Sequence, residues 1–328
     1  MVRTDRFQGM MGYISEKMNR PLSVWKELVL PLEASCVIAF FYIMTRNLIS
    51  FIVAPARASL ILPMVPGLSL GLDELLYLLP GISLGASFHE IAHGLAALNE
   101  KIKVESVGIA FLPIFPSFFV ELNEEQFLAH EPRSRAQVAS SGPAINMLLF
   151  LAFLFILVGL FSSPDGAYID RVTTPASRFL KVGDVITYAD GTRINGREDL
   201  MKLIDKKRPG EVMALVTRDG RSFNVTLTTN PNNETAPFLG IFAVDYFGDT
   251  PLSYPDFNMI LYRIVSWATN INFSLAVINS SPIFFLDGEK VTEAVSEMKG
   301  IKVHKALSYL SVLLLLANIS FSVLSLGL

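Results

Sequence analysis

Residues 76–98 read LYLLPGISLGASFHEIAHGLAAL, an apolar stretch with two histidines and a glutamate in its second half. About 20 helical residues cross the hydrocarbon core of a bilayer, so this stretch is long enough for a membrane span. Ionisable side chains inside a span are costly and functional by default. Gly81 and Gly85 form a pair of small residues one turn apart, which would let a neighbouring helix approach closely. The stretch therefore predicts a transmembrane helix that carries a site within the bilayer.

Other apolar blocks extend this prediction along the chain, which has 328 residues, 51% of them hydrophobic and only 17% charged. Soluble domains usually carry about a quarter charged residues. We expect four further spans, at residues 29–53, 138–161, 258–286 and 306–328. Residues 104–122 are apolar as well, but two prolines, Pro113 and Pro116, disfavour a simple helix there. The predicted fold class is a polytopic α-helical membrane protein with about five to six spans and a membrane-associated β or re-entrant segment.

A polar insert between the membrane blocks predicts a small α+β domain outside the membrane. Alternating runs at 167–172 and 223–227 predict strands, and Asp190-Gly191 and Asp219-Gly220 predict hairpin turns. A helix fits at 197–206. The expected domains are therefore a cytoplasmic N-terminal segment at 1–28, a membrane core at 29–161, the insert domain at 162–250 and a second membrane core at 251–328.

Basic residues orient the predicted spans. They gather in the N-terminal segment, after the span at 76–98 and before the last span, whereas the loop between the first two spans has only Arg57. An excess of Lys and Arg marks cytoplasmic loops. We therefore expect a multi-pass protein of the cell membrane, with its N-terminus in the cytoplasm and the insert domain outside. The net charge of −3 argues against a nucleic-acid-binding surface. The long apolar blocks make the lipid bilayer the expected environment.

The string His89-Glu90-Ile91-Ala92-His93 predicts a zinc site. Histidines at i and i+4 lie on one face of a helix, so both imidazoles can bind the same tetrahedral ion. The glutamate after the first histidine can serve as general base toward a metal-activated water. The alternative is a histidine pair that only packs in a helix interface, and the cost of placing three ionisable groups inside a span disfavours it.

A catalytic zinc needs a third protein ligand and one open position. Two carboxylates compete for this role: Glu121 in the broken segment, and Asp287 at the end of the block 258–286. Asp287 is the better candidate, because a helix interrupted by Pro282 could carry it into the membrane. By spacing alone, however, Asp287 and Gly288 would more readily form a turn at a helix end.

Two further motifs resemble those of the site-2 protease family. That family pairs His-Glu-x-x-His with a distant Asn-x-x-Pro-x-x-x-x-Asp-Gly motif, matched here at Asn279, Pro282, Asp287 and Gly288. The Gly-Pro-x-x-Asn pattern at residues 142–146 also resembles the family. The likeness covers nearly the whole chain. It implies an intramembrane metalloprotease of peptidase family M50, with one zinc ion bound by His89, His93 and Asp287, Glu90 as catalytic base and Asn279 near the substrate.

The insert resembles a PDZ domain in its permuted bacterial order, at residues 174–176, 182–186 and 218–220. The resemblance implies that residues 238–241, with Gly240, form a glycine loop that binds a terminal carboxylate on backbone N–H groups. An ordinary edge strand is the alternative. The implied partners are single-span membrane proteins already shortened outside the membrane by another protease.

The function implied by the resemblance is cleavage of transmembrane segments of membrane-anchored proteins, known as regulated intramembrane proteolysis. One alternative is a catalytically inactive membrane scaffold that uses the PDZ domain, which the intact set His89, Glu90, His93 and Asp287 disfavours. Another is a zinc transporter, which would spread polar residues along several spans. For Asn146 we expect a structural role in helix packing. The broken segment 104–122 is expected to offer a strand edge to an unwound substrate.

Overall fold

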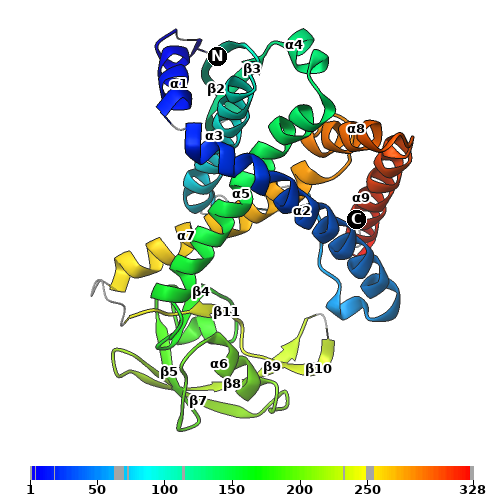
Figure 1. The fold of residues 1–328 in the computed structure, drawn as a ribbon. Coiled ribbons are helices and arrows are strands. Elements are labelled where there is room, and N and C mark those ends of the chain that lie inside the picture. Colours follow the sequence, from blue (N-terminus) through cyan, green and yellow to red (C-terminus); the bar gives the residue numbers. More distant parts are fainter. Residues whose placement is uncertain are drawn as a thin grey trace. The chain divides into compact units, whose positions relative to one another are not determined.

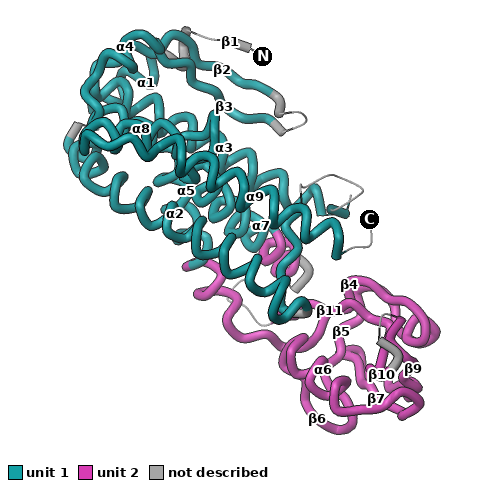
Figure 2. The backbone as a smooth tube through the Cα atoms, turned by 90° about the vertical axis from the view of Figure 1, so that its right-hand side faces the viewer, with its two compact units in different colours: residues 1–154, 264–328 teal, residues 155–263 magenta. Residues whose placement is uncertain are grey.

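The computed structural model describes residues 2–3, 5–17, 19–62, 70–71, 74–112, 115–231, 233–248 and 255–325. They form two compact units, one of residues 1–154 and 264–328 and the other of residues 155–263 (Figure 2). The second unit contains the predicted insert at 162–250, together with one end of each helix that leads into it. Figure 1 shows the elements of both units in chain order.

Four described helices are long and apolar enough to cross a membrane; they lie within α2 (Asn19–Val53), α3 (Leu75–Asn99), α5 (Pro132–Leu160) and α9 (His304–Ser325). The fifth expected span forms α7 (Pro255–Ser280), which is not among these four and mixes Asn, Ser and Thr into its apolar sequence. The prediction of a helical membrane protein is thus supported by four helices. The count of about five to six spans stays a prediction.

Small and polar residues bring the long helices together. A Cβ on Gly81 would lie 2.8 Å from Ala268 Cα, and one on Gly85 would lie 2.8 Å from Asn272 Oδ1. Such close approach matters in a membrane, where lipid tails are as apolar as leucine and packing drives helix association. The prediction that a helix packs closely on this pair is confirmed, and that helix is α7.

A buried polar pair joins α2 to α9. Asn47 Nδ2 donates to Asn318 Oδ1 at 3.0 Å, and Asn318 Nδ2 donates in turn to the carbonyl of Met44 at 3.1 Å. Asn318 is fully buried. Because a polar side chain in hydrocarbon must find a partner, these bonds specify how the two helices pack.

Residues 104–122 form a β-hairpin. β2 (Val104–Leu112) pairs with β3 (Phe115–Leu122) in an antiparallel register from Val104 opposite Leu122 to Leu112 opposite Phe115. The short β1 (Val2–Arg3) pairs with the other side of β2, which leaves β3 at the edge of the sheet. Pro116 lies in β3, where an edge strand tolerates it, and Pro113 lies outside the described residues. The expectation that this segment is no simple helix is confirmed.

Shorter elements complete the first unit. They are α1 (Asp5–Lys17), the 3-10 turn η1 (Pro55–Arg57), α4 (Glu124–Ala129) and α8 (Asp287–Lys299). The Asn123 side chain caps α4 by accepting a hydrogen bond from Gln126 N at 2.8 Å. Helix α8 is followed by Gly300, whose φ of 64° is the left-handed conformation that ends many helices.

The second unit is built on an antiparallel sheet of six strands, in the order β11-β4-β5-β7-β8 with β6 paired to β5. The strands are β4 (Ala167–Val172), β5 (Val185–Ala189), β6 (Thr192–Arg193), β7 (Val212–Thr217), β8 (Ser222–Thr226) and β11 (Ile241–Asp245). A separate pair is formed by β9 (Thr228–Asn230) and β10 (Asn233–Phe238), and the helical elements are η2 (Ala176–Arg178) and α6 (Arg197–Ile204). The predicted α+β class of the insert is confirmed.

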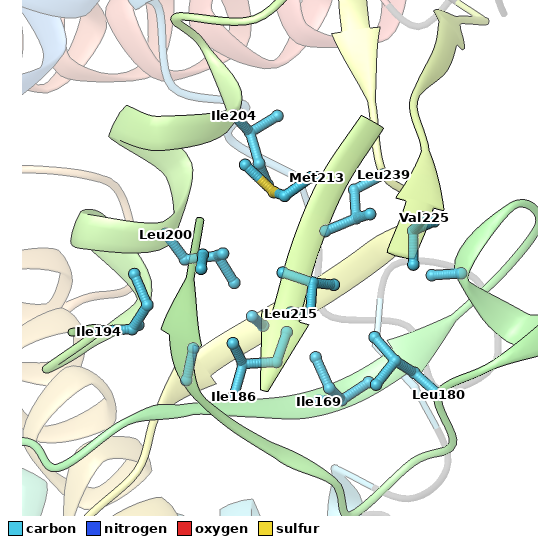
Figure 3. Close-up of a cluster of buried hydrophobic side chains, with 14 of the residues drawn as sticks. Ile169, Leu180, Ile186, Ile194, Leu200, Ile204, Met213, Leu215, Val225 and Leu239 are labelled. Carbon is cyan, nitrogen blue, oxygen red and sulfur yellow. The ribbon is translucent and has the colours of Figure 1, made fainter. Parts of the chain in front are cut away.

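The core of this unit lies between α6 and the sheet. Figure 3 shows its side chains, among them Leu200 from α6, Ile169 from β4, Ile186 from β5 and Leu215 from β7, all fully buried. The predicted turn Asp190-Gly191 joins β5 to β6, and both residues have positive φ, 47° and 74°, as a tight hairpin requires. Burial of this core gives the unit its own source of stability.

Candidate metal centre

Two imidazoles converge because α3 is helical through residues 89–93. His89 and His93 stand one turn apart on the buried face of this helix, and each is only 8% exposed. Their Nε2 atoms lie 3.1 Å apart, with the rings edge to face. The two nitrogens therefore point at one location, as the spacing predicts.

The carboxylate comes from the break between α7 and α8. α7 ends at Ser280, the chain turns through Pro282, and α8 begins at Asp287. Asp287 Oδ2 lies 3.0 Å from His89 Nε2 and 3.2 Å from His93 Nε2. Asp287 thus begins a helix and does not end one. Gly288 is required for steric reasons, because a Cβ there would overlap the carbonyl of Ser280.

The three atoms fit a single zinc ion. Tetrahedral zinc binds His N and carboxylate O at about 2.0–2.2 Å, which places ligand atoms about 3.3 Å apart; here they are 3.0–3.2 Å apart. Among the described residues, His89, His93 and Asp287 form a group of His, Cys, Asp and Glu able to hold a metal. Gly142 of α5 leaves space for an ion beside the two imidazoles. A Cβ at this position would lie 2.6 Å from His89 Nε2 and would overlap His93 Nε2.

Helix α5 also contacts the Nδ1 atom of each imidazole ring. His93 Nδ1 lies 2.8 Å from the carbonyl oxygen of Val138, and His89 Nδ1 lies 3.0 Å from Asn146 Nδ2. Asn146 is fully buried. The sequence favours a helix-packing role for Asn146, and in the structure its side chain also contacts a ring of the site. The Gly-Pro-x-x-Asn pattern could have indicated that both residues lie at the site, because Gly142 and Asn146 are one turn apart on the same face of α5.

Glu90 faces the same cavity, of ≈ 490 Å³, from the next position along α3. Its Oε2 accepts a hydrogen bond from the backbone N–H of Val120 in β3 at 3.3 Å. The cavity is lined by apolar groups and by charged ones: His89, Glu90, His93, Val120, Leu122, Glu124, Phe127, Leu128, Arg135, Val138, Ala139, Asp287, Lys290 and Glu293. A carboxylate beside a metal position, in a cavity with room for a peptide, is the arrangement that hydrolysis needs.

Other candidates lie elsewhere. Glu121, the rival third ligand, accepts a hydrogen bond from Ser106 Oγ at 2.6 Å across the β2–β3 hairpin and does not join the metal group. Asn279 is half-buried near the end of α7 and is not among the described residues that line the cavity. Gly240 lies in the second unit, where its φ of 80° and the nearby carbonyl of Thr173 require glycine.

Comparison with known proteins assigns the family. The sequence matches peptidase family M50 over residues 77–318, most of the chain, including all three ligand candidates. The chain belongs to peptidase family M50. As a family M50 chain with four helices able to cross a membrane, it is a membrane protein of the protease class.

Individual relatives agree with this assignment. An uncharacterized protein of Methanocaldococcus jannaschii is 30% identical over 291 residues, covering 86% of this M50 chain and 74% of that protein. The membrane-bound transcription factor site-2 protease homolog of Arabidopsis thaliana is 23% identical over 147 residues, 42% of this chain but only 29% of that protein.

Two solved structures are similar to a part of the chain. They are the PDZ domains of SdrC-like proteins from Listeria innocua and Listeria monocytogenes, 25% and 27% identical, each covering 24% of this chain. The match covers 93% and 88% of those domains, with TM-scores of 0.22 and 0.21.

Proposed function

We propose that this M50 chain is a zinc-dependent endopeptidase that cleaves transmembrane segments of membrane-anchored proteins. The observation that carries the proposal is the meeting of His89 Nε2, His93 Nε2 and Asp287 Oδ2 within 3.2 Å, beside Glu90 and a peptide-sized cavity. The two histidines lie on α3, one of the four helices long and apolar enough to span a bilayer, and Asp287 begins α8. Family membership supports the same reaction class.

The proposed chemistry divides between the metal and the protein. Zinc in this position would supply Lewis acidity, activating a water molecule and polarising the peptide carbonyl. Glu90 takes the proton of the attacking water and delivers it to the leaving amine, as a general base that then becomes a general acid. Its hydrogen bond to Val120 N holds one carboxylate oxygen, and so restricts the direction in which the other can point.

Replacing Glu90 with Gln tests this assignment. Glu90→Gln keeps the side-chain shape and does not remove a metal ligand, so the purified variant should bind about one zinc per chain, as wild type does. Cleavage of a model single-span substrate should fall about 10²- to 10⁴-fold, because the general base is lost. Metal analysis and a gel-based cleavage assay, with and without a chelator, give both readouts. Wild-type activity in Glu90→Gln, or in chelated enzyme, would contradict the proposal.

We also propose that an unwound substrate pairs with the outer edge of β3. The N–H groups of Phe118 and Val120 point from this edge toward α3, bonded to Ser87 Oγ at 3.2 Å and Glu90 Oε2 at 3.3 Å. The bond from Phe118 N to Ser87 Oγ is long, and a carbonyl oxygen of an added strand could replace it while Val120 N stays bonded to Glu90. A strand in that position would run beside Glu90. Helical substrates hide their peptide bonds, so pairing of this kind would expose one for attack.

The second unit is proposed to control access. In the orientation that the basic loops indicate, it lies outside the membrane and the N-terminus lies in the cytoplasm. The unit would either exclude substrates with bulky external domains or bind the new carboxyl terminus left by an earlier cut, with Gly240 in the binding loop. Both roles imply single-span substrates that another protease has already shortened.

A further inference from the structure

We propose that Asn146 is a positioning residue for the metal, which accepts the Nδ1 proton of His89 and so keeps Nε2 free to bind zinc. The observation behind this is the contact of 3.0 Å between the Asn146 amide and His89 Nδ1, made inside the protein by a fully buried side chain. The inference rests on the proposed zinc site but is independent of peptide cleavage.

The tautomer of His89 follows from the position of its neighbours. Its Nε2 faces Asp287 Oδ2 and His93 Nε2, so Nε2 is the nitrogen that would bind a metal. A neutral imidazole carries one proton, and when Nε2 is the ligand that proton must be on Nδ1. Nδ1 then donates a hydrogen bond, and the side chain within reach must offer an oxygen.

His93 provides an internal comparison. Its Nδ1 lies 2.8 Å from the carbonyl oxygen of Val138, which can only accept, so this ring donates from Nδ1 and presents Nε2 to the metal position. Val138 and Asn146 are both on α5. One helix therefore supports both rings, by a main-chain oxygen for one histidine and by an amide side chain for the other.

The orientation of the Asn146 amide makes the inference specific. In the structure Nδ2 faces His89 Nδ1, and Oδ1 is buried without a hydrogen-bond partner among the described residues. When His89 binds zinc through Nε2, its Nδ1–H and the Asn146 Nδ2–H would be two donors facing each other, which cannot form a hydrogen bond. A half-turn of the amide brings Oδ1 to Nδ1 and gives the ring proton its acceptor. We therefore assign the turned amide to the metal-bound protein.

Zinc affinity of the full-length protein in detergent provides the test. The dissociation constant is measured by competition with a chromophoric chelator for wild type, Asn146→Leu and Asn146→Asp. Removing a partner of a metal-bound histidine typically weakens metal binding about 10- to 100-fold, and we expect this for Asn146→Leu. Asn146→Asp keeps an acceptor oxygen and should stay much closer to wild type. Asn318→Leu, another fully buried Asn with hydrogen bonds in α9, should leave the affinity unchanged.

Several outcomes would overturn the inference. Wild-type affinity in Asn146→Leu, or equal losses in the Leu and Asp variants, would show that Asn146 only fills space. If Asn146→Leu does not fold, ¹⁵N NMR of histidine-labelled, zinc-loaded wild type decides: a proton on His89 Nδ1 supports the role, and a proton on Nε2 contradicts it. A wild-type protein that binds no zinc would contradict the metal site itself, which is a different failure.

Discussion

At the scale of single residues, the metal centre depends on the absence of a side chain at Gly142 as well as on its three ligands. His89, His93 and Asp287 supply three ligand atoms, but the volume between them exists because position 142 has no Cβ. A methyl group there would lie 2.6 Å from His89 Nε2, closer than carbon and nitrogen atoms can pack without bonding. Gly142 is therefore as necessary to the site as the ligands.

Gly142→Ala should abolish zinc binding and proteolysis, because the new Cβ would occupy the volume between the two imidazoles. The measurement is zinc content per chain together with substrate cleavage. Gly159→Ala is the matched control: it is the same substitution on the same helix α5, at a position where a Cβ would meet nothing within 4 Å. Gly142→Ala with one zinc per chain would contradict this account of the site.

At the scale of elements, α3 carries the two histidines and the proposed base, and backbone groups of β3 bond to side chains of α3. The proposed base is Glu90, and the outer N–H groups of β3 bond to Ser87 and Glu90 on that helix. The prolines of the segment 104–122 indicated that no simple helix would form there. The structure places the β3 edge of the hairpin against α3, whereas β1, distant in the sequence, pairs with β2.

Phe118→Pro tests strand addition at β3, because it removes the N–H that bonds to Ser87 Oγ and changes no metal ligand. We expect zinc content to stay at wild-type level. We expect kcat/KM for a single-span substrate to fall about tenfold, because the loss of one hydrogen bond costs roughly that factor in transition-state stabilisation. Phe118→Ala keeps the N–H and serves as the control for the lost side chain. Equal activities in the two variants would argue against pairing at this edge.

At the scale of the whole molecule, the reaction and its proposed regulation belong to different units. Every ligand candidate, Glu90 and both supports of the histidines lie in residues 1–154 and 264–328, whereas Gly240 and its sheet lie in residues 155–263. Metal binding should therefore not require the sheet of the second unit. We expect the second unit to affect which substrates are cleaved, and not metal binding.

Replacing residues 162–248 with a short Gly/Ser linker should leave zinc content unchanged, because no ligand is removed. If the unit excludes bulky substrates, the deletion should speed cleavage of a substrate that keeps its folded external domain. If the unit binds the cut carboxyl terminus, the deletion should slow cleavage of the shortened substrate. Cleavage rates of both substrates by both enzymes distinguish these roles, and a deletion that changes the rate for neither substrate would contradict access control by this unit.

Features that depend on local periodicity could be predicted from the sequence. Apolar length predicted the long helices, and the spacing of His89 and His93 predicted convergence on one side of a helix, because residues four apart share a face. Gly-containing turns and alternating runs in the insert predicted its hairpins. The resemblance to site-2 proteases indicates Asp287 as a ligand, and the match to peptidase family M50 covers this residue.

Tertiary structure alone decided which distant groups meet. Asp287 lies 198 positions from His89, and only the turn after α7 brings its oxygen to the imidazoles. The roles of Gly142 and Asn146 have the same origin, since empty volume and a hydrogen bond to another helix are properties of packing. A periodic pattern in the sequence shows which face of a helix or strand is buried. Which other element packs on that face depends on the free energy of the contact, and this depends on the residues of both elements.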